Sequence, residues 1–412
     1  MTCTFSTALN VPLISKKTPG YLGHLDYETI ELTNQQKRLR GRYALRPTID
    51  LRGFKTRAVI DWLTLGVLLE RTTQFWWIQD EIAGLLGSPP FVQNILSEER
   101  QSSVGFDVTF QEPDITTVLK AVAAIESRFG LGMEPVVRGV EISVDFRPVV
   151  PSALDRAKMA RVLMNHLLVE PDVVSNLRDR PRTVWGRGKD KVTRLIYDSR
   201  HLTAEENKRF LIETDRDRAP FTDGTFELGA KEAGVRWRVM DKIIDRQNVQ
   251  AGTFIALDEK SKRARIEVTL DRPEVAELGV MFLSDLKKLN FSKLQGRYFR
   301  FFLPTFSRPA ELRPGARSAL TAWNDRQRAL KFSKTGSIGL KAMDEAFAEQ
   351  RTELKRQALP DMHGRGLRLQ RTARVGIGSA GSFVAYEDLN ERVLTALRNL
   401  GKRVAAGFGS GA

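Results

Sequence analysis

The strongest constraint on the fold is the segment 136–150, which reads VVRGVEISVDFRPVV. Apolar residues occupy the even positions from 140 to 146, whereas Glu141, Ser143 and Asp145 occupy the odd positions between them. Because successive side chains of a strand point to opposite faces, this alternation predicts a β-strand with one apolar face and one face that carries two carboxylates. A chain that contains this strand is expected to build a sheet with one face in a core.

A second segment, RARIEVTLDR at 263–272, has the same pattern, with Arg265 and Glu267 on the face opposite its aliphatic residues. Asp61 lies in a third apolar stretch, RAVIDWLTLGVLL, at 57–69. Carboxylates on neighbouring strands repel one another unless a cation lies between them, and Mg²⁺ and Mn²⁺ prefer such oxygen ligands. The candidate ligands of a divalent metal ion are therefore the acids of these three strands, Asp61, Glu141, Asp145 and Glu267.

The same acids also allow a reading without a metal ion. A half-exposed sheet often carries acids on its wet face, where they pair with arginines on neighbouring strands. Arg138, Arg236 and Arg265 are available for such pairs. The spacing of the residues alone leaves both interpretations open.

The order of the expected elements predicts an α+β fold, with an antiparallel or mixed central sheet and helices packed on one side, followed by a mainly helical C-terminal domain. Helical periodicity is expected at 72–102, where it stops at Gly87-Ser-Pro-Pro, and at 115–130 and 153–168. Hairpins are expected at 182–202 and 224–244. The segment LPTFSRPAELRPG near 305–315 concentrates proline and glycine, as linkers do. The predicted parts are a basic irregular arm at 1–55, an α+β domain at 56–305, and a helical, winged-helix-like domain at 310–412.

The net charge narrows the classes of partner, and the cysteine content narrows the cellular compartment. The chain has 65 Lys and Arg against 50 Asp and Glu, a net charge of +15, which favours nucleic acid or an anionic membrane surface as partner. No window approaches the ~18–20 apolar residues of a membrane span, so no membrane association is expected. The single cysteine, Cys3, excludes an internal disulfide, and the N-terminus lacks a signal-peptide pattern. A cytoplasmic protein is therefore expected.

Four segments, taken in order, resemble the replication-initiation-factor family, which contains rolling-circle initiators of plasmids and filamentous phages and related relaxases of mobile elements. They are IDWLTL (60–65), VVRGVEISVDF (136–146), GTFELGAKEAGVRWRVMDK (224–242) and RARIEVTL (263–270). The corresponding pieces of the family read roughly as IDWLSV, an (I/V)TR(I/L)D strand, a GT-aromatic hairpin that ends in R-aliphatic-YDK, and R-aliphatic-E. The resemblance covers about residues 57–272.

This resemblance implies a metal-dependent DNA nickase that initiates replication. A tyrosine hydroxyl would attack one origin phosphodiester and leave a 5′-phosphotyrosyl link and a free 3′-OH. The metal would lie on the four acids named above, or on a subset of them. The implied partners are double- and single-stranded origin DNA and the host helicase and polymerase, and a homodimer stays open. The implied DNA-binding residues are the cations of the matched strands and of a neighbouring hairpin, Arg194, Arg236, Arg238, Lys242 and Arg265.

The chain departs from the family at the nucleophile. Met240 stands where the family has the tyrosine of YDK, and methionine cannot form a phosphoester. Glu141 replaces the first aspartate of the second motif, and Gly139 stands next to Arg138. Tyr197, in TRLIYDS, copies the shape of the missing motif and is the candidate nucleophile, although a structural role for this tyrosine is also open. The alternative function is a non-nicking DNA-binding initiator or regulator of the same family, and a basic scaffold protein is the third hypothesis.

Overall fold

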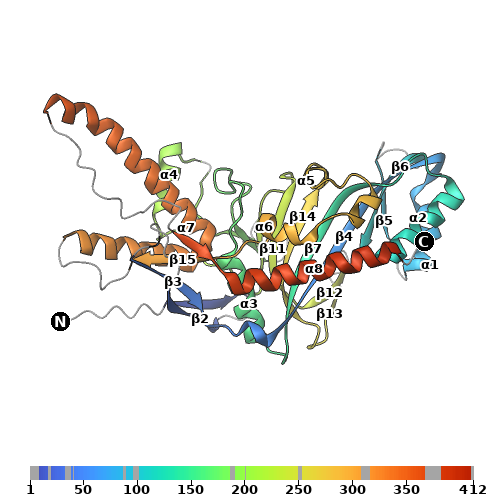
Figure 1. The fold of residues 1–412 in the computed structure, drawn as a ribbon, viewed down its shortest axis with the longest axis horizontal. Helices are drawn as coiled ribbons and strands as arrows, with labels where there is room; N and C mark the ends of the chain where they lie inside the picture. Colours follow the sequence, from blue (N-terminus) through green and yellow to red (C-terminus); the bar gives the residue numbers. More distant parts are fainter. Residues whose placement is uncertain are drawn as a thin grey trace.

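The protein is an α+β fold, as the order of its sequence patterns predicts. The computed structural model of the chain describes residues 9–16, 20–32, 39, 41–86, 90–95, 102–185, 191–199, 201–248, 253–307, 316–366 and 382–409. These residues form two antiparallel sheets, a two-stranded ribbon and eight α-helices (Figure 1).

The larger sheet has nine strands in the order β5-β6-β4-β7-β14-β11-β10-β8-β9. Their bounds are β4 Phe54–Gln74, β5 Phe91–Asn94, β6 Ser102–Gln111, β7 Val136–Pro148, β8 Arg182–Val184, β9 Val192–Arg194, β10 Thr225–Leu228, β11 Val235–Lys242 and β14 Arg263–Asp271. The two strands expected from strict alternation are therefore confirmed as β7 and β14, and they are direct neighbours. β4, which carries Asp61, lies on the other side of β7.

The smaller sheet has five strands in the order β1-β2-β3-β15-β16. These strands are β1 Asn10–Ser15, β2 Gly20–Glu31, β3 Arg42–Pro47, β15 Phe302–Ser307 and β16 Phe383–Ala385, and the separate ribbon pairs β12 Ile244–Asn248 with β13 Thr253–Ala256. The prediction of an irregular arm at 1–55 is therefore wrong for its described part. Leu13, Leu25 and Ala44 are fully buried there. These short apolar faces are enough to form strands of a sheet, although the segment is basic in composition.

The helices are α1 Phe75–Leu86, α2 Ile115–Phe129, α3 Ala153–His166, α4 Ala204–Ile212, α5 Arg272–Glu277, α6 Phe291–Tyr298, α7 Ala316–Gly364 and α8 Glu387–Gly409, with short 3₁₀ turns at Leu51–Gly53 and Leu283–Lys287. The helix expected after residue 72, with a stop at Gly87-Ser-Pro-Pro, is confirmed as α1, which ends at Leu86. Proline lacks the N–H that a helix requires and restricts the residue before it. The rest of the segment up to 102, grouped with this helix, instead contains strand β5, and β6 begins at Ser102.

Helices cover the apolar face of the larger sheet. The indole of Trp237 on β11 is 1% exposed and donates a hydrogen bond of 2.8 Å to the carbonyl of Tyr298 in α6. Arg156 of α3 pairs at 2.9 Å with Asp241 on the same face of β11. α8 packs on α6 and on β4, and Figure 1 shows it running across the sheet. The opposite, polar face of β11 carries Arg238.

The C-terminal residues are mainly helical, but they do not form a separate domain beginning near 310. β15 pairs with β3 from the N-terminal part and with β16 near the C-terminus. α7 bends at Gly336, whose φ is 67°, and a Cβ there would lie only 2.9 Å from the Cα of Asn165 in α3. Both C-terminal helices thus complete the packing of the strands before them. Most of the cationic segment MHGRGLRLQRTARVG at 362–376, whose sequence predicts a linker or a wing, lies outside the described residues.

Candidate metal centre

A bulge in β4 places Asp61 at the centre. The register of β4 with β7 passes from Ile60 opposite Ile142 to Trp62 opposite Glu141, so Asp61 is an extra residue without a partner on β7. An extra residue in one strand bends it and redirects side chains. The Asp61 carbonyl accepts a hydrogen bond of 2.7 Å from the N–H of Glu112, which follows β6.

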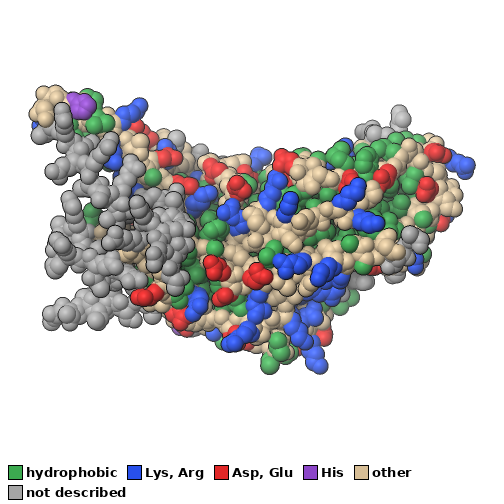
Figure 2. Space-filling model, in the orientation of Figure 1, with side chains coloured by type: hydrophobic (Ala, Val, Ile, Leu, Met, Phe, Trp, Pro, Cys, Tyr) green, Lys and Arg blue, Asp and Glu red, His purple; other side chains and the backbone are tan. Residues whose placement is uncertain are grey.

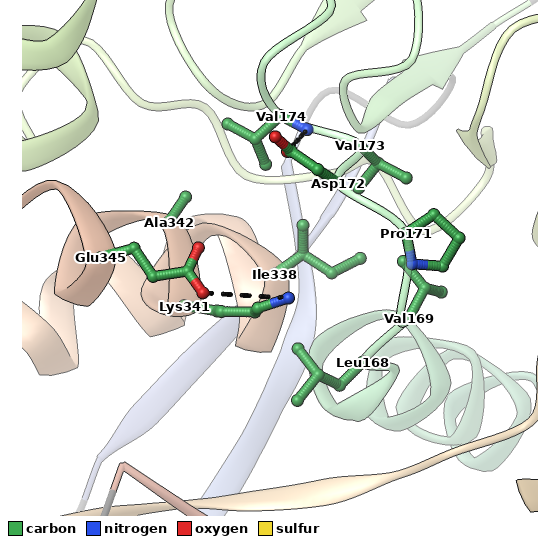
Figure 3. A pocket seen from close by; sticks show the side chains of 10 residues that line it. All are labelled: Leu168, Val169, Pro171, Asp172, Val173, Val174, Ile338, Lys341, Ala342 and Glu345. Carbon is green, nitrogen blue, oxygen red and sulfur yellow. Dashed lines mark hydrogen bonds and ion pairs between the residues drawn. The ribbon is translucent and has the colours of Figure 1, made fainter. Parts of the chain in front are cut away.

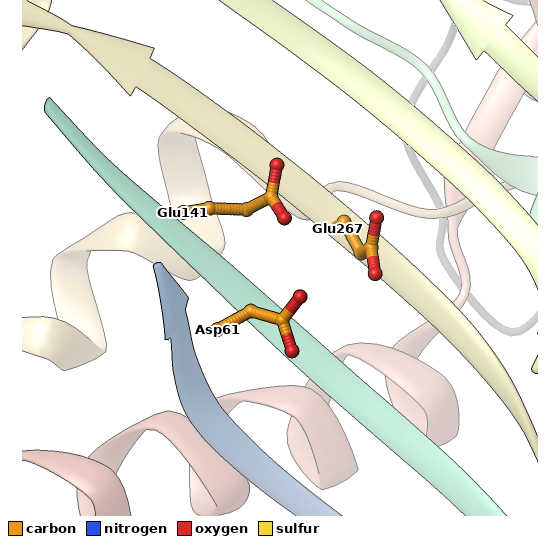
Figure 4. Close-up of side chains that lie close together, drawn as sticks. All are labelled: Asp61, Glu141 and Glu267. Atoms are coloured by element: carbon orange, nitrogen blue, oxygen red, sulfur yellow. The ribbon is translucent and has the colours of Figure 1, made fainter. Parts of the chain in front are cut away.

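Three carboxylates from three strands meet on the polar face of the larger sheet. Asp61 of β4, Glu141 of β7 and Glu267 of β14 each offer an oxygen, and these oxygens lie within 4.8 Å of one another (Figure 4). Each of the three residues is at most 5% exposed. Carboxylate oxygens at this separation are the donor set that a hard divalent cation prefers, so these residues could hold a metal ion.

Arginines already compensate much of this buried charge. Arg265 of β14 is 0% exposed and donates to both oxygens of Asp145, at 2.5 and 2.8 Å, and to Asp61 at 2.5 Å. Arg263 lies 2.9 Å from Asp145 as well. The structure therefore brings three of the four predicted metal ligands together and leaves the fourth, Asp145, bound to arginines.

Arg238 of β11 lies between two of the clustered carboxylates. Its Nη2 is 2.8 Å from Glu141 Oε2 and 2.8 Å from Glu267 Oε2, and its side chain is 37% exposed. The contact with Glu267 lacks hydrogen-bond geometry, so this buried oxygen accepts no hydrogen bond. Lys242 lies farther away, with its Nζ 3.8 Å from Asp61. A metal ion at this position would compete with Arg238, the most exposed of the cations around it.

The environment drives the pKa values of two clustered acids apart. Burial, reinforced by the neighbouring charges of Glu141 and Asp61, raises the pKa of Glu267 to about 7, although Arg238 opposes the shift. Burial also opposes ionisation of Asp61, but Arg265 and Lys242 outweigh it, and the pKa of Asp61 lies below its usual value. Close to neutral pH the cluster therefore exchanges a proton at Glu267, and binding of a cation would compete with that proton.

The cationic strand β11 has the alternation that the sequence predicts. Val235, Trp237 and Val239 are buried on the helix-covered face. Arg238 lies directly opposite Glu267 in the register with β14, and Met240 lies directly opposite Arg265. Met240 therefore shares the polar face with the carboxylates.

Tyr197 lies at the other end of the sheet. It lies three residues after the end of β9, which is the fourth strand beyond β14 in the sheet, and four strand spacings of about 4.8 Å separate β9 from β14 by roughly 19 Å. Its ring packs on Phe210 of α4, with 4.7 Å between ring centroids, and the Arg216 guanidinium lies 4.8 Å from the ring centre. Arg194 pairs with Asp198 at 2.7 Å in the same region. The structure thus keeps Tyr197 and Arg194 apart from the three carboxylates.

The sequence analysis missed two residues of this neighbourhood, Glu112 and Arg263. Glu112 has a φ of 41°, in the left-handed region, and its carboxylate lies 3.7–3.8 Å from Arg263, Arg265 and Lys242. It stands in a loop, where no alternation marks a shared face. Arg263 could have been found, because it has the same parity as Arg265 and Glu267 along β14.

Two cavities among the described residues lie away from the three carboxylates. One, between the loop after α3 and helix α7, encloses about 20 Å³, room for a single water molecule (Figure 3). Another, of about 760 Å³, is an open groove between the start of α8 and β3, and its charged lining mixes acids with arginines. Neither is lined by Asp61, Glu141 or Glu267.

Comparisons with known proteins add no relative. No protein-family model matches the chain, and no curated protein matches it. Among the described residues, no helix is both long and apolar enough to cross a membrane.

Proposed function

We propose that this protein is a DNA-binding replication initiator of the rolling-circle type, from a plasmid, phage or mobile element, and that it holds Mg²⁺ or Mn²⁺ on Asp61, Glu141 and Glu267. One observation carries the proposal. Three carboxylates from strands far apart in the sequence converge on one face, beside Arg238 and Lys242. These are the segments, in the same order, that resemble the initiator family.

Each part of this polar face has a role in the proposal. A divalent cation, when bound, polarises a phosphoryl oxygen and offsets charge on a phosphodiester. Arg238 has the exposure needed to leave the carboxylates and donate to a phosphate. Arg265 is fully buried and bridges Asp61 and Asp145, so its role is to position the ligand Asp61.

The placement of the tyrosine favours binding without nicking. Met240 lies beside the carboxylates, whereas Tyr197 lies four strands away from β14. A nucleophile must come within about 3–3.5 Å of the phosphorus that it attacks, while the metal contacts the same phosphate. We therefore propose the non-nicking initiator as the function, and nicking by Tyr197 becomes the alternative outcome of the test.

The test combines metal binding, DNA binding and adduct formation. Calorimetry with MnCl₂ alone is expected to show binding to the full chain, lost in Glu141→Gln and kept in Glu232→Gln, an exposed acid in the β10–β11 turn. Fluorescence anisotropy with 30-nucleotide single-stranded and duplex probes is expected to show salt-sensitive binding that Mn²⁺ tightens in the wild type but not in Glu141→Gln.

Denaturing electrophoresis of the same mixtures tests whether the protein nicks DNA, because it detects a covalent protein–DNA adduct. No covalent protein–DNA adduct is expected. An adduct that disappears in Tyr197→Phe would replace the non-nicking proposal with a nickase. Absence of DNA binding at 150 mM salt, with or without Mn²⁺, would refute the proposed function.

A further inference from the structure

The surplus positive charge is not spread evenly over the described surface. Many exposed cations have an acid beside them, such as Arg46 with Glu28 at 2.7 Å and Lys208 with Glu349 at 2.9 Å. Such pairs contribute nothing to the net charge. The surplus must therefore lie where cations have no acidic partner.

One such place is the free edge of β4. β4 pairs with β7 from Phe54 onward, but with β6 only from Trp62 onward, so its first residues have one open edge. α8 lies along this edge. Arg392 donates to the carbonyl of Phe54 at 3.4 Å, and Arg403 donates to the carbonyl of Ala58.

Cations without an acidic partner surround this edge. Lys55 and Arg57 are exposed on β4, and Lys402 and Arg403 are exposed on α8. Within the part of the chain that the structure describes, none of the four forms an ion pair with an acid. We call these four residues, Lys55, Arg57, Lys402 and Arg403, the edge patch. Figure 2 shows Lys and Arg side chains gathered on this side of the molecule, over α8 and the strands next to it.

The cations of the edge patch repel one another at a cost to the fold. Arg403 has a pKa below its usual value because it is partly buried and because Arg57 lies near it. Arg147 of β7, opposite Lys55, has a buried Nε without a hydrogen-bond partner. The acids of α8 lie in its first turns, and its sequence from 392 onward contains none. An anion brought to this edge would relieve that repulsion.

The edge patch is connected to the candidate metal centre through side chains on the polar face of the larger sheet. Arg57 lies directly opposite Asp145 in the register of β4 with β7. Asp145 in turn binds Arg265, which binds Asp61. A polyanion lying over the carboxylates and Arg238 could therefore extend over Arg57 and Lys55 to α8.

The surroundings favour a phosphate backbone over an anionic membrane. Membrane-surface helices add large exposed apolar residues to their cations. The large exposed hydrophobic residues of the described chain include none on α8. Lys55 and Arg57 are two residues apart along a strand, about 6.8 Å, so they can follow a chain of phosphates.

We propose that the edge patch binds the sugar–phosphate backbone of the DNA whose phosphates approach the candidate metal centre. The inference rests on the proposed function and adds the surface along which the DNA continues. It assigns Lys55, Arg57, Lys402 and Arg403 to sequence-independent phosphate contacts.

The test compares two triple variants with the same change in net charge. The patch variant is Lys55→Gln, Arg57→Gln and Lys402→Gln, which leaves the Arg403 contact to β4 intact. The control variant is Arg71→Gln, Lys231→Gln and Lys260→Gln, three exposed cations away from this edge. Anisotropy titrations with the 30-nucleotide duplex are run from 50 to 300 mM NaCl, and thermal unfolding verifies that both variants fold.

Loss of three phosphate contacts is expected to lower the slope of log Kd against log salt by about 2–3 and to raise Kd about tenfold or more at 150 mM. The control is expected to stay within about twofold of the wild type. Equal weakening of both variants, or wild-type binding by the patch variant, would overturn the inference while the proposed function stands. Loss of binding to vesicles with 30% phosphatidylserine, without loss of DNA binding, would assign the patch to membranes instead. A wild type that binds no DNA would remove both proposals.

Discussion

Replacement of Arg265 by methionine is the sharpest test of the charge arrangement at the candidate metal centre. Arg265 is 0% exposed and forms three short contacts, two with Asp145 and one with Asp61. Methionine fills much of the same volume but leaves the carboxylates without this cation. Removing one partner of a buried ion pair costs about 3–5 kcal/mol, because the remaining charge stays buried and uncompensated.

Urea unfolding, followed by circular dichroism at pH 7.5, measures this loss. The matched control is Arg46→Met, which removes an ion pair with Glu28 at a site where both side chains are more than 40% exposed. Exposed pairs contribute about 0–1 kcal/mol, so the control is expected to unfold at nearly the wild-type urea concentration. Equal losses in the two variants, both under about 1 kcal/mol, would refute the reasoning about the buried arginine.

The loss of the buried cation in Arg265→Met also determines how pH and Mn²⁺ affect the stability of this variant. Without Arg265, burial is no longer outweighed at Asp61, and the pKa of Asp61 in the folded state rises above that of the unfolded chain. The destabilisation is then largest above this raised pKa and shrinks as the pH falls and Asp61 is protonated. Mn²⁺ at millimolar concentration should also stabilise Arg265→Met more than the wild type, since a cation replaces the missing charge. No difference in the Mn²⁺ effect would argue against a metal at this cluster.

Two other substitutions test the cluster and the helix packing. Because the pKa of Glu267 is raised to about 7, its protonated form stabilises the fold at low pH, and this contribution is lost as the pH rises through 7. Glu267→Gln should therefore be more stable than the wild type by about 1–3 kcal/mol at pH 8 and equally stable near pH 4. The same variant should lose Mn²⁺ affinity. A difference in the free energy of unfolding that does not change with pH would contradict this reasoning. Gly336→Ala should cost about 2–4 kcal/mol, from its φ of 67° and the contact with Asn165, while Gly364→Ala, with open space around it, should change stability by under about 0.5 kcal/mol. Equal effects of the two glycine substitutions on the thermal midpoint would show that the bend in α7 is not constrained.

Strict alternation made two strands and their faces predictable. β7 and β14 each place apolar residues on one face and carboxylates on the other, and the structure pairs them directly. The cationic face of β11 was predictable for the same reason, because a period of two is a local property of an extended chain. The order of the expected elements likewise indicated an α+β fold, and the composition indicated a high positive charge.

The five-stranded sheet was not predictable in this way. Its strands come from both ends of the chain, and β15 joins β3 to β16. Their apolar faces are short and interrupted by charges, so a local pattern reads as an irregular arm and a proline-rich linker. Only long-range pairing gives these segments a buried face.

The sequence by itself determined which strands carry acids and which strand carries arginines. The tertiary structure alone decided which of these residues meet. The bulge at Asp61 changes the parity of β4, so this acid joins Glu141 and Glu267. Asp145, predicted as a fourth ligand, instead binds Arg265 and Arg263, and Tyr197 lies beyond four strands. A bulge and the order of strands in a sheet depend on pairing between distant segments, and no local period of side chains records them.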